Sequence, residues 1–320
     1  MDKVDLIIQN GNSIQIPALE EPIAWETTRA GAPGKLTFTV VKDPTLNFQE
    51  GNPVSFKKDS DDVFYGFIFS KKRNKGSTIE VTAYDQLRYF KNKDTYIIEN
   101  ETASDFHKRL ISDFQLRAGT IEDTKFVIPS RVEDNKTLFD MSQNTLDITL
   151  ANAKEMFVLY DDFGKLTLKN IGSMKVDFLV DDETGEDFDY TSSIDSQTYN
   201  KVKLAYDNTE TGKREIYISK DSNNINNWGV LQYFEKIEEH TNGQVKADAL
   251  LSLYNRKTRH LKLKNIIGDV RVRGGSLIVV NLNLGDITVK NYMMVENAKH
   301  NFKHGEHFMD LTVRGGDFIA

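Results

Sequence analysis

Residues 1–90 alternate between apolar and polar positions in short runs, which is the pattern of half-buried β-strands. The clearest runs cover residues 35–41, 63–69 and 78–84. The polar segment 71–76 connects the last two runs and ends on a glycine, which predicts a β-hairpin. Several short strands with turns between them are typical of a small barrel or sandwich.

The hydrophobic period changes after residue 90. Apolar positions recur at helical spacing in residues 106–114 and again in 136–153. Two apolar runs, 156–160 and 165–169, flank the turn sequence Asp-Asp-Phe-Gly and predict a second hairpin. We therefore expect residues 91–176 to form a separate α+β module with two helices and a β-hairpin.

Acidic residues then gather in one segment, and the pattern becomes strand-like again beyond it. The acids are Asp177, Asp181, Asp182, Glu183, Glu186, Asp187 and Asp189. Such a run of like charge indicates a solvated linker, which we place at residues 177–192. Residues 193–320 are predicted to form a second β domain that contains one helix, from 244 to about 257.

The two β domains share an order of landmarks: a glycine before a strand, a tyrosine that opens an apolar run, and a glycine in the next loop. These are Gly51, Tyr65 and Gly76 in the first domain, and Gly275, Tyr292 and Gly305 in the second. The order predicts that residues 1–90 and about 190–320 are two copies of one β-barrel fold.

Composition narrows the functional classes. The chain has 320 residues, 39% of them hydrophobic and 28% charged, which is typical of globular proteins of two or three domains. It has no cysteine, which excludes thiol proteases, zinc–thiolate sites, iron–sulfur clusters and disulfides. The absence of cysteine fits folding in a reducing cytoplasm.

Charge and hydropathy indicate which partners to expect. Lys and Arg number 41 against 48 Asp and Glu, so the net charge is −7 and phosphate backbones would be repelled on average. The amino terminus opens with acids and has only three consecutive apolar residues, so we expect no signal peptide. No apolar run approaches the roughly 20 residues that span a bilayer. We expect no membrane partner and no specific nucleic-acid binding.

Three histidines fall within eight residues: His300, His304 and His307. On a helix, His300 and His304 would share one face and hold zinc with a third ligand. Strand-like runs flank the segment, however, and Gly305 occupies a position suited to a tight turn. We therefore favour a hairpin in which the histidines are turn and cross-strand residues, with no metal site.

Other motifs fail on spacing. The acidic run offers no start point that gives the EF-hand its glycine and its final glutamate. The segment 31–35 has two residues between its glycines, where a phosphate loop needs four. There is no G-x-S-x-G elbow. Carboxylate pairs for glycoside hydrolysis stay open, because the chain has 48 acids and nothing distinguishes any pair. We assign no catalytic residue and no cofactor.

A resemblance adds to this interpretation. Its most distinctive residues are Asn200, Trp228, Gly229, Gly268, Asp269, Gly275 and Gly305, with His300 and His307 in the last hairpin. Together with the order of the predicted domains, these residues make the chain resemble the baseplate hub proteins of contractile phage tails, PBSX-like defective prophages and R-type bacteriocins. The resemblance implies a mainly β fold with an α+β insertion: two tail-tube-like β-barrel domains separated by a small α+β module.

The resemblance also implies structural work. The resemblance implies a homotrimer in which each chain contributes two barrels. The six barrels form a ring that adapts a hexameric tail tube to a trimeric spike. The expected partners are the chain itself, the tail tube protein, the spike protein and other baseplate proteins. The expected location is the bacterial cytoplasm during assembly, then the baseplate of a virion or bacteriocin tail.

Two other functions stay open at this point. One is a carboxylate-dependent hydrolase that degrades peptidoglycan. The other is a tail protein that binds cell wall or a receptor, for which exposed aromatics such as Trp228 and Tyr233 would line a groove. A peptidoglycan zymogram tests the first function, and binding to intact cells or purified wall tests the second.

Overall fold

The computed structural model describes residues 4–315 except 182, 185–186, 196, 209–210, 238–241 and 286–287. Acids Asp182 and Glu186 of the acidic run thus lie outside the described residues. The chain is mainly β and divides into two compact units. The first comprises Met1–Asp189 and Leu261–Ala320, and the second comprises Tyr190–His260.

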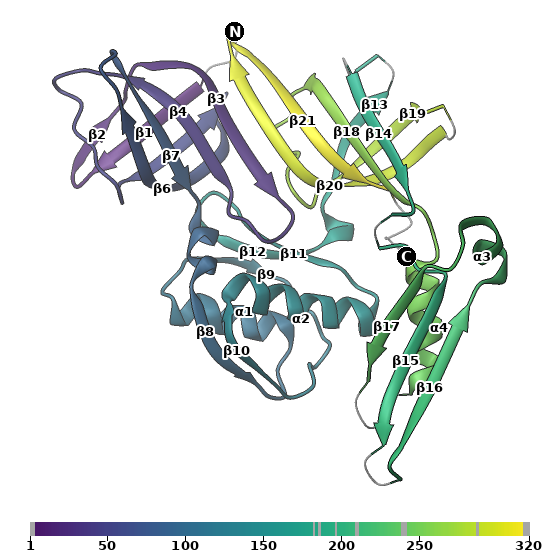
Figure 1. The fold of residues 1–320 in the computed structure, drawn as a ribbon. Coiled ribbons are helices and arrows are strands. Elements are labelled where there is room, and N and C mark those ends of the chain that lie inside the picture. The colour runs from purple at the N-terminus through teal and green to yellow at the C-terminus, as the bar shows by residue number, and fades with distance from the viewer. Residues whose placement is uncertain are drawn as a thin grey trace. The chain divides into compact units, whose positions relative to one another are not determined.

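The amino-terminal strands form one half of a large sheet in the first unit (Figure 1). They are β1 (Val4–Asn10), β2 (Ser13–Gln15), β3 (Leu19–Thr28), β4 (Lys35–Val41), β5 (Pro53–Lys58), β6 (Asp61–Arg73) and β7 (Thr78–Tyr84). Leu36, Phe38 and Val40 show why the alternation folds this way: all three are buried, and the residues between them are only partly covered. One face of the sheet therefore makes the core.

The expected helices and hairpin follow in an α+β module within the same unit. Its elements are η1 (Gln86–Lys91), β8 (Lys93–Ile98), α1 (Ala103–Asp113), β9 (Ala118–Ile121), β10 (Arg131–Thr137), α2 (Leu138–Ala153), β11 (Phe157–Asp161), β12 (Leu166–Asn170) and η2 (Ile171–Ser173). Figure 1 shows α1 and α2 beside the sheet of β9, β12 and β11. Their buried faces, with Phe106, Leu110 and Met141, fill a separate core.

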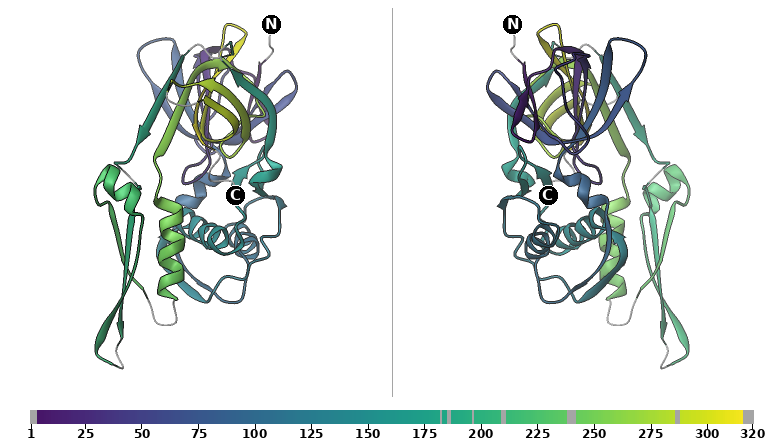
Figure 2. Two further views of the ribbon diagram at one scale, coloured as in Figure 1. Left: turned by 90° about the vertical axis from the view of Figure 1, so that its right-hand side faces the viewer. Right: turned by 90° about the vertical axis from the view of Figure 1, so that its left-hand side faces the viewer.

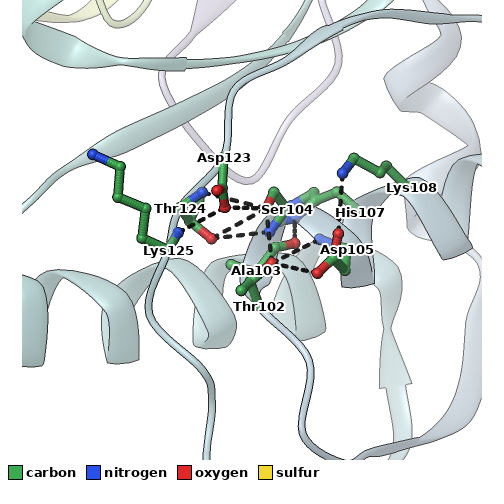
Figure 3. Close-up of polar contacts among 9 residues, drawn as sticks. All are labelled: Thr102, Ala103, Ser104, Asp105, His107, Lys108, Asp123, Thr124 and Lys125. Carbon is green, nitrogen blue, oxygen red and sulfur yellow. Dashed lines mark hydrogen bonds and ion pairs between the residues drawn. The ribbon is translucent and has the colours of Figure 1, made fainter.

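Helix α1 begins where its sequence supplies caps (Figure 3). Oγ1 of Thr102 accepts a hydrogen bond from the backbone N–H of Asp105 at 3.2 Å, which satisfies one of the free donors at the helix start. The N–H of Ser104 donates to Oγ1 of Thr124 at 3.1 Å, so the loop before β10 closes over the same helix end. Thr137 caps α2 in the same way, by accepting from the N–H of Asp140.

The second half of the large sheet is built from two segments of the chain, one before and one after the second unit. Its strands are β13 (Lys175–Asp181), β14 (Asp187–Ser193), β18 (Thr258–Ile267), β19 (Leu277–Asn283), β20 (Thr288–Lys303) and β21 (Glu306–Arg314). The two halves join through antiparallel pairing of β3 with β20. Among the described residues, thirteen strands share this one hydrogen-bonded sheet.

The segment 177–192 is therefore not the linker that its charge suggested. β13 pairs in parallel with β19 and buries Val180, and β14 pairs with β18. Asp187 and Asp189 are exposed on β14 and both form ion pairs with Lys264. Side chains at alternate positions of a strand share one face, so the acids can lie together on the exposed face. The number of acids therefore obscured the two-residue period that is typical of a strand.

The second unit differs from the continuous β domain expected over residues 193–320. It contains β15 (Lys201–Asn208), β16 (Lys213–Lys220), α3 (Ser222–Trp228), β17 (Gln232–Lys236) and α4 (Gly243–Tyr254). It therefore has two helices, where the sequence predicted one. Helix α4 packs along one face of the β16–β15–β17 sheet (Figure 2), and its Ala247 shares a buried cluster with Val202 and Leu204 of β15. The helix α3 was missed because it buries no side chain and so has no apolar stripe.

The two halves of the large sheet share one topology. Apart from the short β2 at its end, the first half has the order β1-β5-β6-β7-β4-β3, and the second has the order β13-β19-β20-β21-β18-β14. Ranked by position in the chain, both orders are first, fourth, fifth, sixth, third, second. Three features distinguish them. The short β2 pairs with β1 and has no counterpart among the described strands of the second half, β1 is antiparallel to β5 whereas β13 is parallel to β19, and the second unit is inserted between β14 and β18.

Backbone details repeat as well. The N–H of Gly51 donates to the carbonyl of Ile68 at 2.7 Å, and the N–H of Gly275 donates to the carbonyl of Val295 at 2.8 Å. One residue after each of these acceptors, the ladder to the next strand shifts register, between Ile68 and Ser70 in β6 and after Val295 in β20. Ile68 and Val295 are thus equivalent positions, and the shared strand order supports an internal repeat.

Candidate functional site

The last hairpin brings two of the three candidate histidines together. His300 on β20 and His307 on β21 are both buried, and Nδ1 of His300 lies 2.9 Å from Nε2 of His307. Nε2 of His300 lies 2.9 Å from the carbonyl oxygen of Val272. A carbonyl only accepts, so Nε2 of His300 carries the hydrogen, and its Nδ1 accepts from His307. Burial, with the nearby His307, lowers the pKa of His300 to about 3, so the ring is neutral at pH 7.

Aromatic packing explains why these rings lie here. The ring centroid of His300 is 4.7 Å from that of Trp25 on β3, and His307 stacks on Phe302 at 4.2 Å. Gly268 leaves room for this stack, since a Cβ at that position would overlap the His307 ring. The N–H of Gly268 also donates to the carbonyl of His307 at 2.8 Å. The pair is part of the packed junction between β20, β21 and β3.

His304 lies apart from the other two. It occupies the turn of the hairpin with φ of 57°, its side chain is 71% exposed, and Nδ1 lies 3.9 Å from a carboxylate oxygen of Glu21. Gly305 follows it with φ of 71°, which suits glycine. Among the described residues, no three His, Asp or Glu side chains are grouped so that they could hold a metal ion.

The other residues of the resemblance occupy bends and loop anchors. Asn200 is fully buried; its Nδ2 donates to the carbonyl of Gly229 at 2.7 Å and its Oδ1 accepts from the N–H of Leu231 at 2.9 Å. It thereby holds the bend after α3, where Trp228 is the last helical residue and Gly229 has φ of 76°. Tyr233 packs against two other tyrosines of the same unit.

Asp269 and Gly275 lie on the connection between β18 and β19. Asp269 forms an ion pair with Arg271 at 2.6 Å. Gly275 has φ of 94°, and a Cβ there would lie 2.8 Å from Val158 of β11, so this glycine permits the α+β module to approach the second half of the sheet.

Sequence reasoning missed a buried polar cluster in the first unit, formed by Asp85, Asp161 and Arg273. Asp85 follows β7, Asp161 ends β11, and Arg273 precedes β19, so each comes from a different part of that unit. Nη2 of Arg273 donates to the backbone carbonyl of Asp161 at 2.8 Å, and the guanidinium carbon lies 4.1 Å from the ring centroid of Tyr160. No spacing rule links these residues, because their proximity exists only in the folded chain.

The two carboxyl groups of this cluster are bound by the chain's own amides. Asp85 accepts from the backbone N–H groups of Gly34 at 2.8 Å and Leu87 at 3.0 Å. Asp161 accepts from the N–H of Gly164 at 2.5 Å and from Gln86 at 3.3 Å.

Desolvation raises the pKa of Asp85 well above its usual range, and the charge of Asp161 raises it further. Desolvation also raises the pKa of Asp161, against the opposing charge of Arg273. All four carboxylate oxygens of the pair already accept hydrogen bonds from the protein. This arrangement fastens three parts of the unit together.

The structure also bears on membrane insertion and on ligand space. None of the described helices is both long and apolar enough to cross a bilayer. A cavity lined by Arg29, Leu87 and Phe157, among others, has a volume of about 20 Å³, which is room for roughly one water molecule.

Comparisons place the chain among tail proteins. A family model described as YQBQ-like matches residues 23–314. Phage-like element PBSX protein XkdQ of Bacillus subtilis is 30% identical over 305 residues, which cover 92% of this chain and 91% of that relative. The 43 kDa tail protein of prophage MuSo2 from Shewanella oneidensis has a similar fold at 12% identity, with a TM-score of 0.70 over 99% of this chain and 100% of that one.

A third likeness reaches beyond phages. The c3393 protein of E. coli is a type VI secretion component with structural similarity to the T4 tail proteins gp27 and gp5. It matches at a TM-score of 0.59 and 8% identity, over 98% of this chain and 77% of its own. The fold of this chain is thus shared along nearly its whole length with prophage tail proteins.

Proposed function

Since the chain belongs to the YQBQ-like family, we propose that it is the structural hub of a phage-type tail baseplate, a protein that assembles and does not catalyse. One observation carries the proposal: a single chain contains two sheet halves with the same strand order. Three such chains supply six equivalent positions around one axis. A ring of this kind matches a six-fold tube on one side and a three-fold spike on the other.

The proposed partners follow from that symmetry. They are two further copies of the chain, the tail tube protein, the spike protein and the surrounding baseplate proteins. The mature location is the baseplate of a virion or bacteriocin tail, after assembly in the bacterial cytoplasm. The sequence relationship to a protein of the phage-like element PBSX supports this location.

The chemistry of the described residues favours assembly over hydrolysis. The buried carboxyl pair, Asp85 and Asp161, resembles the acid pair of a glycosidase in composition, yet hydrogen bonds from the protein hold each oxygen. We therefore expect a blank peptidoglycan zymogram from the full chain. Clearing that disappears in the Asp161→Asn variant would contradict the proposal.

The assembly test uses the full chain with candidate neighbours. We expect sedimentation velocity to show three-chain particles that form alone or when the tube or spike protein is added. Class averages from electron microscopy should show a ring with six similar lobes. A chain that stays single with both neighbours present would refute the hub function.

A further inference from the structure

The internal junction between the two sheet halves provides a template for contacts between copies. Residues Ile23–Thr28 of β3 pair antiparallel with Asn297–Phe302 of β20. Just beyond the ladder, the N–H of Arg29 donates to the carbonyl of Glu296, and Nε of Arg29 contacts the Glu296 carboxylate, both at 2.9 Å. Strand β20 is long enough to pair with β19 over its first part and with β3 over its second.

Strand β6 is the counterpart of β20 in the first half. Since Ile68 is equivalent to Val295 and each precedes the same register shift, Ser70–Arg73 is equivalent to Asn297–His300. β5 pairs with β6 only as far as Phe67, and β7 takes one edge of the segment beyond it. Within the described part of the chain, no strand pairs with the other edge of Ser70–Arg73, which is where β3 lies on β20.

Strand β14 is the counterpart of β3, because each is second in its half and lies at the same end of the strand order. β3 has two neighbours, β4 and β20. β14 has one neighbour among the described strands, β18, and it ends the sheet. Each side of the junction thus occurs twice in the chain. One pair of edges, on β20 and β3, is paired within the chain, and the equivalent edges on β6 and β14 have no strand neighbour among the described residues.

The charges of the two unused edges are complementary. The β6 segment carries Lys72 and Arg73 as exposed cations, whereas Lys71 is engaged with Glu50. β14 carries Asp187 and Asp189. The internal junction has the same polarity.

In that junction, Lys299 of β20 lies opposite Glu26 of β3. Lys72 is the equivalent of Lys299 in the first half of the sheet. Lys72 and the β14 acids are exposed, with side-chain partners only within their own halves, Glu80 and Lys264. No described strand pairs with either edge. Opposite charge at such an edge guides pairing and register.

We propose that β14 of one copy pairs antiparallel with Ser70–Arg73 of β6 in the next copy, repeating between chains the β3–β20 junction that each chain makes within itself. Each copy then offers one donor edge and one acceptor edge, so the contact is head to tail. It closes into a ring of three when successive copies are related by one third of a turn. The pairing also covers two strand edges that would otherwise invite aggregation. The ring size of three rests on the proposed hub function, whereas the choice of edges does not.

Cysteine cross-linking tests the choice of edges, since the natural chain has no cysteine. Full-length Lys72→Cys protein is mixed with a panel of single variants along β14: Asp187→Cys, Phe188→Cys, Asp189→Cys and Tyr190→Cys. The panel covers both faces of the strand, because the register between copies is the unknown. The matched control is Lys57→Cys, a half-exposed lysine on β5, which is paired on both sides.

We expect mild oxidation to join Lys72→Cys protein to one or two panel members and to leave the Lys57→Cys mixtures unlinked. A chain that carries both productive cysteines should give a three-chain product on a non-reducing gel. Adding Arg73→Glu to that chain should reduce the yield, because it reverses a charge on the same β6 edge. Chains that form rings yet cross-link only at the control position would overturn the strand pairing and spare the hub function. Chains that stay single with tube and spike proteins present would overturn both.

Discussion

His107 illustrates how burial fixes the charge of a side chain in this protein. It lies fully buried between α1 and α2, with Nδ1 2.6 Å from the carbonyl of Ala103 and Nε2 2.6 Å from Oγ of Ser142. Burial lowers the pKa of His107 to about 4. The ring is neutral in the folded chain, whereas in the unfolded chain it binds a proton near pH 6.5.

The pH dependence of stability follows from that difference. Because the folded pKa is the lower one, the stabilisation is complete above pH 6.5 and is lost as the pH falls toward 4. This group alone should lower the free energy of unfolding by about 3 kcal/mol across that window. We expect urea unfolding of His107→Gln at pH 7.5 and 4.5 to show a smaller pH effect than the natural chain. An unchanged pH effect would contradict the assignment.

Gly268 gives a second prediction at the residue scale. A Cβ at this position would overlap the ring of His307, which is held between Phe302 and His300 and has little freedom to move. We expect Gly268→Ala to lower the free energy of unfolding by about 1–3 kcal/mol. Gly315→Ala is the control, because the nearest atom to its new Cβ is 3.9 Å away. Equal effects of the two substitutions in thermal unfolding would disprove this packing argument.

Local patterns predicted some of these residues and missed others. The turn at His304 and Gly305 follows from the strand-like runs on both sides, so the hairpin and its cross-strand histidines were predictable. The partner of His300 was not, because Val272 approaches from a loop whose position depends on tertiary folding. The Asp85–Asp161–Arg273 cluster was invisible for the same reason.

At the scale of elements, the sequence predicted those strands in which apolar and polar residues alternate regularly. Strands β4 and β7 occupy the predicted residues, because each alternates cleanly with one buried face. β13 and β14 were hidden, since charge on their exposed positions dominated the segment. The second unit was missed as a unit because its strands have the same period as the sheet it interrupts, and only contacts distinguish the two.

The insertion point of the second unit yields a prediction about elements. The chain leaves the sheet along β14 and returns along β18, and Oγ1 of Thr258 donates to the carbonyl of Ser193 at 3.1 Å. The two ends of the insertion are therefore adjacent. Replacing residues 195–256 by a short Gly/Ser linker should leave the large sheet folded, because adjacent termini permit excision without stretching the chain.

Thermal unfolding and near-UV circular dichroism check this expectation. The shortened chain should unfold cooperatively and keep the near-UV signal of Trp25, which packs against His300. A matched excision inside the α+β module, of residues 103–153, serves as control and should abolish folding, since α1 and α2 supply much of that module's core. A shortened chain that unfolds without cooperativity would show that the second unit is needed for the rest.

At the scale of the whole molecule, the ring of six sheet halves that we propose would surround a channel whose wall must suit what passes through it. Each chain carries a net charge of −7, so three chains carry −21. A field of this sign disfavours adhesion of DNA or of an acidic protein at moderate ionic strength. The basic segment Lys71–Arg73 is the main local exception on β6, and the proposed pairing with β14 would place acids against it.

The last prediction therefore concerns nucleic acid. We expect no measurable binding of duplex DNA at physiological salt, because each lysine–phosphate contact adds salt-dependent affinity and would slow a passing strand. A mobility-shift titration checks the assembled ring, and the Lys72→Glu variant in single-chain form provides the comparison. If the single chain binds DNA weakly at low salt, that affinity should fall when β14 of the next copy covers Lys71–Arg73 and in the Lys72→Glu variant. Tight binding by the assembled ring would mean that the channel wall is basic, and a passive conduit would then be excluded.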